Sequence, residues 1–473
     1  MSSDDVVHFT DVTFRDGSQS LWGLRLSYHM MEPVLAEVAE AGYKSIELST
    51  FFATLLVGVR YFKEDPRILH KMISEKLGDT SSNISLVSLG TQISVSKPSE
   101  NQTACRLYYE QYKEWIPQIN QGAVLMCTQD EVKRSAPIIF PMWRKLGIEP
   151  IPYLAIGHGA RHTPEFYADV TAELVEKYQP KQITLEDASG LLTPERFRLI
   201  YSAVRAVANG TPIELHAHGM NGLHNYNMVV GMEMGMRHFA TCIPPLANNS
   251  SHPSIFDVAN NVEQMGLKHN MDLDKLHVVE ERLRKAGAAY GNPVDNPPLP
   301  FNLFDYKHQI PGGVISNTRV QLEELGMGDQ LNEVLEEIPR ILEDLGHPVM
   351  ATPFSQFIAT QAALNVQLGR WEHVLDACVD LAAGLFGIED PGLNEMKPEI
   401  KDMLLSQPYA KNALKKAARV SEYMNSSPSE AECKAEVGLP PDASREEYVL
   451  KQQLGDELDV CTPNGPDSYQ RFL

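Results

Sequence analysis

Eight short apolar segments, rich in β-branched residues, recur along the first half of the chain, and longer segments of helical periodicity separate them. The strand-like segments are residues 6–14, 44–50, 84–90, 122–128, 149–157, 182–187, 212–218 and 238–243. Two of the helical segments, "TPEFYADV" and "TPERFRLI", open on Thr-Pro, which suits a helix N-cap and first turn. This alternation predicts an α/β fold, a (β/α)8 TIM barrel, whose active sites lie at the C-terminal ends of the strands.

The composition narrows the class of protein. A formal net charge of -21 argues against nucleic acid and against an anionic membrane surface as partners. No run of about 18 apolar residues occurs, and the N-terminus "MSSDDVVHF" is acidic and lacks an apolar signal core. These features predict a cytoplasmic protein without a membrane span. Six scattered cysteines without a Cys-x-x-Cys motif predict free thiols.

Ionisable side chains gather where three of the predicted strands end. They are Arg15, Asp16 and Gln19 after the first strand, Glu186 and Asp187 at the end of the sixth, and His216 and His218 at the end of the seventh. Because the side-chain period of a strand is two, His216 and His218 point to the same side, here taken as the barrel lumen. Two imidazoles with one or two carboxylates predict a site for a divalent transition metal.

Each of these residues has more than one interpretation. Glu186 is a candidate metal ligand, a general base or a salt-bridged structural acid. Asp187 faces away from Glu186 and is expected to cap the following turn. Arg15 either satisfies a buried carboxylate or contacts an anionic substrate. The remaining histidines near strand ends are expected to be packed or solvent-facing, not ligands, and they are His158, His162, His224 and His252.

The motifs "DVTFRDGSQSL" and "ELHAHGMNGL" resemble the metal-dependent carboxyltransferase barrel of pyruvate carboxylase, transcarboxylase and oxaloacetate decarboxylase, a relative of hydroxymethylglutaryl-CoA lyase. The resemblance continues through "RYFKEDPRILHKM", "EDASGLLTP", "HQIPGGVISNTRVQLEELG" and "VMATPFSQFIATQAALNV", so it spans residues 5–400. It implies a barrel domain over residues 1–300 and a smaller, mainly α-helical domain over 301–424 that packs over the barrel mouth. Residues 425–473 are expected to form a surface extension with one short helix.

The resemblance also implies a ligand set. Asp16, His216 and His218 would hold zinc, manganese or cobalt, and Glu186 stands where the family has a carboxylated lysine. A carboxylate is a planar monoanion like a carbamate, so Glu186 can supply the same charge, although it is shorter. A water acidified by the metal would fill the gap if the metal does not shift.

The resemblance assigns further residues to catalysis and substrate binding. Arg15 and Gln19 are implied near the substrate, and Ser250 is the nearest match to a hydroxyl residue that carries a proton, with Ser251 as the alternative. Leu89 stands where pyruvate-using members have an arginine that grips the substrate carboxylate. A leucine cannot replace that charge-assisted pair, which argues against pyruvate. Arg60, in a matching motif, is the second position assigned to substrate binding.

We therefore predict an enzyme that makes or breaks a carbon–carbon bond next to a carbonyl by carboxyl transfer or decarboxylation, on a small carboxylate or carbonyl substrate other than pyruvate. The sequence contains no Met-Lys-Met biotin segment, so any biotin would arrive on another chain, a biotin carrier or carboxylase subunit. The family implies a homodimer. Two alternatives are a biotin-independent lyase or hydrolase and a non-catalytic assembly subunit; the costly cluster of ionisable groups argues against the latter.

Overall fold

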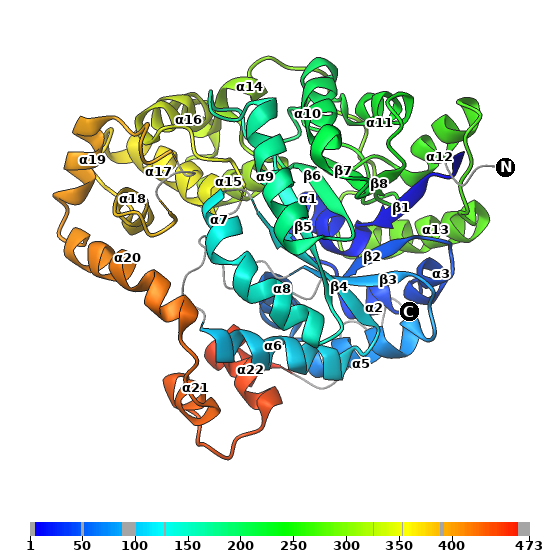
Figure 1. Ribbon diagram of the computed structural model, residues 1–473, viewed down its shortest axis with the longest axis horizontal. Helices are drawn as coiled ribbons and strands as arrows, with labels where there is room; N and C mark the ends of the chain where they lie inside the picture. The colour runs from blue at the N-terminus through cyan, green and yellow to red at the C-terminus, as the bar shows by residue number, and fades with distance from the viewer. Residues whose placement is uncertain are drawn as a thin grey trace.

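Parallel strands close into a barrel in the computed structural model, which describes residues 5–48, 52–87, 101–126, 129–324, 326–351, 353–387 and 392–461 (Figure 1). The strands are β1 (His8–Asp11), β2 (Ser45–Leu48), β3 (Asn83–Val87), β4 (Ile119–Leu125), β5 (Glu149–Ala155), β6 (Ile183–Asp187), β7 (Ile213–Ala217) and β8 (His238–Thr241). They pair in chain order, and β8 pairs with β1 to close the barrel. Each overlaps a predicted segment, so the predicted (β/α)8 barrel is confirmed.

Helices follow the strands around the barrel, and their first turns show why the sequence starts them there. They are α1 (Ser18–Trp22), α2 (Tyr28–Met31), α3 (Leu35–Ala39), α4 (Phe52–Val57), α5 (Pro66–Leu77), α6 (Gln102–Trp115), α7 (Gln129–Arg134), α8 (Ala136–Lys145), α9 (Pro164–Tyr178), α10 (Pro194–Val207), α11 (His224–Glu233), α12 (Ile255–Gln264) and α13 (Leu273–Ala289), with π-helical turns η2 (Thr13–Gly17) and η3 (Gly58–Phe62). The hydroxyls of Thr163 and Thr193 accept hydrogen bonds from Phe166 N and Arg196 N, as the two Thr-Pro motifs predict.

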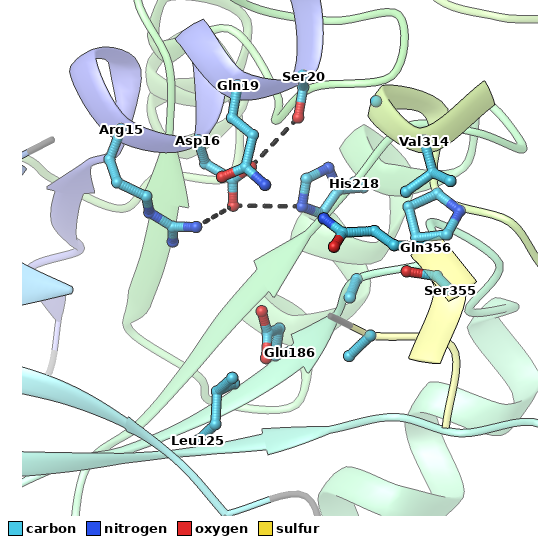
Figure 2. Close-up of a pocket in the computed structure, with 14 residues that line it drawn as sticks. Arg15, Asp16, Gln19, Ser20, Leu125, Glu186, His218, Val314, Ser355 and Gln356 are labelled. Atoms are coloured by element: carbon cyan, nitrogen blue, oxygen red, sulfur yellow. Dashed lines mark hydrogen bonds and ion pairs between the residues drawn. The ribbon is translucent and has the colours of Figure 1, made fainter. Parts of the chain in front are cut away.

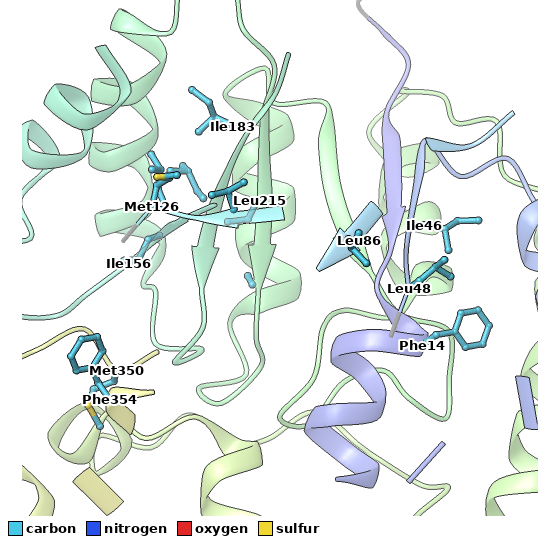
Figure 3. Close-up of a cluster of buried hydrophobic side chains, with 14 of the residues drawn as sticks. Phe14, Ile46, Leu48, Leu86, Met126, Ile156, Ile183, Leu215, Met350 and Phe354 are labelled. Atoms are coloured by element: carbon cyan, nitrogen blue, oxygen red, sulfur yellow. The ribbon is translucent and has the colours of Figure 1, made fainter. Parts of the chain in front are cut away.

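The two faces of each strand have different neighbours. On β7, Leu215 belongs to the apolar core between strands and helices, together with Ile46, Leu86 and Ile183 (Figure 3). Glu214 and His216 alternate with Leu215 and therefore face the lumen. The carboxylate of Glu214 accepts hydrogen bonds from Thr10 and Thr184 of other strands. The barrel interior is thus partly polar next to the inner face of β7.

A second set of helices follows the barrel. They are α14 (Asp305–His308), α15 (Gly312–Glu324), α16 (Leu331–Leu345), α17 (Phe354–Leu368), α18 (Asp376–Ala382), α19 (Pro398–Leu405) and α20 (Ala410–Asn425), with the 3-10 turn η4 (Gly328–Gln330). A mainly helical part after the barrel is confirmed, while the exact boundaries at residues 300 and 424 stay predictions. Among the described residues, no helix combines the length and apolar character needed to cross a bilayer.

The prediction of one short helix after residue 425 is wrong. The tail forms α21 (Glu430–Glu436), α22 (Arg445–Leu454) and the 3-10 turn η5 (Gly455–Val460). Both α-helices begin with a capping box, Ser429 with Glu432 and Ser444 with Glu447. Tyr448 of α22 is buried in the apolar core. The tail therefore packs on the outside of the barrel. Its helices are short, and the two capping boxes and buried apolar residues such as Tyr448 stabilise them although the sequence lacks a long apolar periodicity.

Candidate metal centre

Three of the predicted ligands meet at the C-terminal end of the barrel. Asp16 lies in η2, directly after β1, while His216 faces inward from β7 and His218 follows that strand. All three are buried. Asp16 Oδ2 lies 3.0 Å from His216 Nε2 and 3.3 Å from His218 Nε2. The period-two argument therefore placed both imidazoles correctly on the lumen side.

A third histidine, which was expected from the sequence to be packed or solvent-facing and not a ligand, joins this group. His252, fully buried in the loop after β8, has its Nε2 3.3 Å from Asp16 Oδ2. Its ring centroid lies 4.1 Å from that of His216 and 4.3 Å from that of His218. The only sequence signal for His252 was its place after the eighth strand, at the same end of the barrel as the other ligands.

These four residues fit a transition-metal ion. One donor atom from each of Asp16, His216, His218 and His252 lies within 4.8 Å of the others. Bonds of about 2.0–2.1 Å to four tetrahedral ligands separate the ligand atoms by about 3.3 Å. The observed separations from Asp16 Oδ2 are 3.0–3.3 Å. Imidazole and carboxylate donors suit zinc, manganese or cobalt.

The surroundings set the charge of the group. Burial raises the pKa of Asp16, but the positive charges of Arg15 and His218 outweigh it and hold that pKa well below its ordinary value. Burial lowers the pKa of His218, yet the Asp16 carboxylate outweighs burial and raises it to about 9. Burial, followed by repulsion from His216 and His218, holds the pKa of His252 well below its ordinary value. A metal ion would displace the proton of His218 and take over its pairing with Asp16.

His218 is oriented for coordination by a second contact. Its Nδ1 donates to the backbone carbonyl oxygen of Ser250, with 2.9 Å between the two atoms. This hydrogen bond fixes the tautomer in which Nε2 faces Asp16 with a free lone pair once the extra proton has left.

Glu186 lies at the end of β6 beside His216, its partner in strand register. It is not a member of the group of described residues whose ligand atoms converge within 4.8 Å. Its Oε2 is buried without a hydrogen-bond partner among the described residues, and burial raises the pKa of this carboxyl. A role for Glu186 as a metal ligand stays a prediction.

Arg15 is held by two carboxylates. Its Nη1 lies 2.7 Å from Asp16 Oδ2, and its Nη2 lies 2.6 Å from Glu47 Oε2. The hydroxyl of Tyr153 donates to the other carboxylate oxygen of Glu47. The structure therefore confirms the first interpretation of Arg15, in which it pairs with buried carboxylates. Arg15 also lines the pocket described next.

A pocket opens beside Asp16 and His218, between the barrel mouth and the helices that follow the barrel. Figure 2 shows Arg15, Asp16, Gln19 and Ser20 on one side, Leu125 and Glu186 below, and Val314, Ser355 and Gln356 from α15 and α17 on the other side. Three buried oxygen atoms in this wall, Gln19 Oε1, Glu186 Oε2 and Ser355 Oγ, have no hydrogen-bond partner among the described residues. Buried polar atoms without partners favour a ligand at this place.

The other predicted site residues lie elsewhere. Ser250 Oγ donates to the carbonyl oxygen of Ser20 at 3.1 Å, and Ser250 is not among the described residues that line the pocket. Arg60 has a 59% exposed side chain and pairs with Glu457 of the tail. Leu89 lies outside the described residues. The catalytic role of Ser250 and the substrate-binding roles of Arg60 and Leu89 therefore stay predictions.

Asp187 behaves as its place in the sequence predicts. Its two carboxylate oxygens accept hydrogen bonds from the backbone N–H groups of Leu191, at 3.1 Å, and Leu192, at 2.9 Å. The cap on the turn after β6 is confirmed. This turn leads into α10 and fixes the backbone next to Glu186.

Comparisons with known protein families and proteins relate this chain to carboxylases and carboxyltransferases. Residues 117–283 match a family described as HMGL-like, and residues 306–451 match one described as a conserved carboxylase domain. The 2-oxoglutarate carboxylase large subunit of Hydrogenobacter thermophilus is 27% identical, over 93% of this chain and 66% of that protein. The methylmalonyl-CoA carboxyltransferase 5S subunit of Propionibacterium freudenreichii is 25% identical, over 80% of this chain and 74% of that protein.

Solved structures share the fold. The carboxyl transferase domain of Rhizobium etli pyruvate carboxylase, with pyruvate and biocytin, superposes with a TM-score of 0.80 at 18% identity, over 98% of this chain and 79% of that chain. The barrel, the match to the HMGL-like family and the buried Asp–His group, which could hold a metal ion, are together typical of a TIM-barrel enzyme. Within that class, the chain is similar to subunits of biotin-dependent carboxylases and carboxyltransferases. The non-catalytic alternative is therefore set aside.

Proposed function

We propose that this enzyme transfers a carboxyl group to, or removes it from, a carbonyl substrate other than pyruvate, with the help of a divalent metal ion. The observation that carries the choice of substrate is the double pairing of Arg15 with Asp16 and Glu47. A guanidinium that already balances two buried carboxylates has no positive charge left for a third.

The composition of the pocket wall supports the same choice. Among the described residues that line it, Arg15 is the only arginine or lysine, while Leu125, Val314 and Ala351 are apolar. A small 2-oxo acid needs a cation for its carboxylate, and a pocket with one neutralised guanidinium favours a larger or less anionic substrate.

The roles of the chain's own residues follow from their positions. A metal ion held by Asp16, His216 and His218 would polarise the substrate carbonyl oxygen and stabilise the enolate that forms next to it. Gln19 presents an unpartnered amide oxygen to the pocket and orients a substrate N–H or O–H group. Arg15 holds Asp16 in its ionised, ligating form. Ser250 remains our candidate for a proton carrier if its hydroxyl leaves the Ser20 carbonyl.

The proposed partners come from the relatives. Two of them are named as subunits of a carboxylase and a carboxyltransferase. We propose that another chain, a carboxylase subunit or a biotin carrier, supplies biotin, and that the enzyme works in the cytoplasm as a homodimer. A biotin-independent lyase is the alternative, and activity without biotin would favour it.

A second candidate substrate class is also supported by a specific observation. The relative that covers 93% of this chain is named a 2-oxoglutarate carboxylase, and another, 27% identical over 85% of this chain, is one of the subunits of the pyruvate carboxylase of Methanocaldococcus jannaschii. A 2-oxo acid would therefore become the favoured substrate if pocket residues outside the described part of the chain supply a cation.

The test is a decarboxylation assay on the purified, zinc-, manganese- or cobalt-loaded enzyme. The substrates are oxaloacetate, the carboxylated form of 2-oxoglutarate, methylmalonyl-CoA and β-keto acids whose only carboxylate is the one that leaves, each with and without free biotin. Asp16→Asn is expected to abolish metal-dependent carbon dioxide release. The matched control is Asp295→Asn, because the Asp295 side chain is 91% exposed.

Turnover of a substrate other than oxaloacetate, lost in Asp16→Asn and kept in Asp295→Asn, supports the proposal. If oxaloacetate has the highest kcat/KM, the proposed substrate choice is overturned. If the metal-loaded enzyme acts on none of these compounds, carboxyl chemistry itself is contradicted.

A further inference from the structure

We infer that His252, from the loop after β8, is the fourth ligand of the metal, and that Glu186 stands outside the coordination sphere as part of the pocket wall. The inference concerns the metal that the proposed function requires, but it makes a statement about coordination that holds whatever the substrate is. It departs from the expectation that the end of β6 supplies the fourth ligand.

The first argument is the position of the imidazole. Asp16 Oδ2 has three histidine Nε2 atoms around it, at 3.0 Å for His216 and 3.3 Å for both His218 and His252. His252 therefore stands in the same relation to Asp16 as His218 does. The carboxylate of Glu186, by contrast, is not among the ligand atoms that converge within 4.8 Å in the described part of the chain.

The second argument is that Asp16, itself a member of the group, is the only carboxylate close to the His252 ring nitrogens among the described residues. Its ring is fully buried, and neither of its nitrogens makes a hydrogen bond of good geometry with a described residue. Burying an imidazole without hydrogen bonds is costly, and coordination to a metal would satisfy Nε2. A packing role alone would be served better by an apolar side chain of similar size.

The third argument is that the loop is built to hold this side chain. Asn248 N donates to the carbonyl oxygen of His252 at 2.7 Å, and Ser251 N donates back to Asn248 O at 2.9 Å. Cys242 N donates to Pro253 O at 3.0 Å, which fastens the loop to the end of β8. The same loop supplies the Ser250 carbonyl that accepts from His218 Nδ1, so it orients one ligand while it contributes another.

The ligand set changes the charge of the centre. Two histidines with Asp16 and Glu186 would neutralise a divalent ion, whereas three neutral histidines with Asp16 leave one formal positive charge. The more positive centre polarises a carbonyl oxygen more strongly. A centre of this kind also leaves the carboxylate of Glu186 free to contact the substrate from the pocket wall.

Cobalt titration of the metal-free protein tests the assignment without any turnover. Cobalt(II) affinity and its visible absorption are measured for wild type, His252→Ala, Glu186→Gln and His224→Ala. His224 is the matched control, since it is 1% exposed and lies near the site but outside the converging group. Loss of residues that only support a ligand costs about 10–100-fold in metal affinity, so loss of His252 should cost at least about 100-fold.

We expect His252→Ala to bind cobalt weakly and with an altered visible spectrum, and added imidazole to restore both, since it can occupy the vacated position. Glu186→Gln and His224→Ala should keep wild-type affinity and spectrum. Wild-type binding by His252→Ala, or a loss in Glu186→Gln that equals or exceeds the loss in His252→Ala, would overturn the inference. Circular dichroism of each variant separates loss of a ligand from loss of the fold.

Discussion

Nη2 of Arg15 lies 2.6 Å from Oε2 of Glu47, and both side chains are buried inside the barrel. Glu47 faces inward from β2 and is linked through Arg15 to Asp16 of the candidate metal site, because Arg15 Nη1 lies 2.7 Å from Asp16 Oδ2. The position of Asp16, a candidate metal ligand, therefore depends on Glu47, a carboxylate outside the group of candidate ligands.

Glu47→Gln is the first prediction. Removing one partner of a buried ion pair leaves the other charge poorly compensated, so we expect the free energy of unfolding to fall by about 3 kcal/mol. Metal affinity should fall as well, because Arg15 loses its anchor. Urea denaturation and metal titration measure the two effects. The control is Glu281→Gln, a glutamate with a 66% exposed side chain paired to Lys285, which should change neither. Equal stability of Glu47→Gln and wild type would contradict this account of Arg15.

The close contact between α15 and the His252 loop gives the second prediction. A Cβ atom on Gly312 would lie 2.1 Å from Ser250 Cβ and 2.6 Å from Met220 Sδ, whereas the nearest atom to a Cβ on Gly313 is Gln19 O at 3.5 Å. We expect Gly312→Ala to lower the free energy of unfolding by about 1–3 kcal/mol, because the helix must move off the loop. Gly313→Ala should be neutral or stabilise by up to about 1 kcal/mol, since alanine favours helix. The urea concentrations at the unfolding midpoints of the two variants test this prediction. Similar midpoints would show that α15 does not pack closely on the loop.

Metal removal gives the third prediction. A ligand that binds only the folded state stabilises it, by about 2.7 kcal/mol when its free concentration is 100 times its Kd. We therefore expect chelation to lower the melting temperature and added zinc or cobalt to restore it. Asp16→Asn should lose this metal-dependent shift, because Asp16 Oδ2 is the atom around which the three imidazoles gather. Scanning calorimetry with and without metal measures the shift, and its persistence in Asp16→Asn would place the metal elsewhere.

Most of the barrel and much of the site were predictable because both follow from the strand period. Alternation along a strand places His216 on the inner face, and the end of β1 brings Asp16 to the same end of the barrel. The position of the Glu186 carboxylate was not predictable in this way. Strand register fixes the height of the Glu186 backbone along the barrel axis, but not the conformation of its side chain. The structure leaves that carboxylate outside the converging ligand atoms.

The positions of His252 and of the tail could not be predicted from periodic sequence patterns. His252 lies in an irregular loop, and backbone hydrogen bonds such as Asn248 N to His252 O place it, not a repeating period. The tail lacks long apolar periodicity, yet Arg445 pairs with Glu110 at 2.8 Å and with Glu114, both on α6. Such contacts between distant segments depend on the assembled barrel, so a local interpretation of the tail misses them.

The fourth prediction concerns pH and a carboxyl group far from the metal ligands. Glu64 is 4% exposed and accepts hydrogen bonds from Ser27 Oγ and Tyr28 N. Burial raises its pKa from 4.5 to about 7. Between these values the folded state binds the proton more tightly than the unfolded state does. The stability that this group contributes is therefore fully present below pH 4.5 and is lost as the pH rises through about 7.

Glu64→Gln removes this dependence, because glutamine stays neutral and keeps a hydrogen-bonding side chain of the same size. We expect the stability of the variant relative to wild type to increase by about 3 kcal/mol between pH 4.5 and pH 8, since each pKa unit is worth about 1.4 kcal/mol. Urea denaturation at a series of pH values measures the difference. The control is Glu75→Gln, whose side chain is 64% exposed and whose difference from wild type should stay flat over the same range. A flat difference for Glu64→Gln as well would mean that Glu64 is ionised in the folded protein at neutral pH without cost.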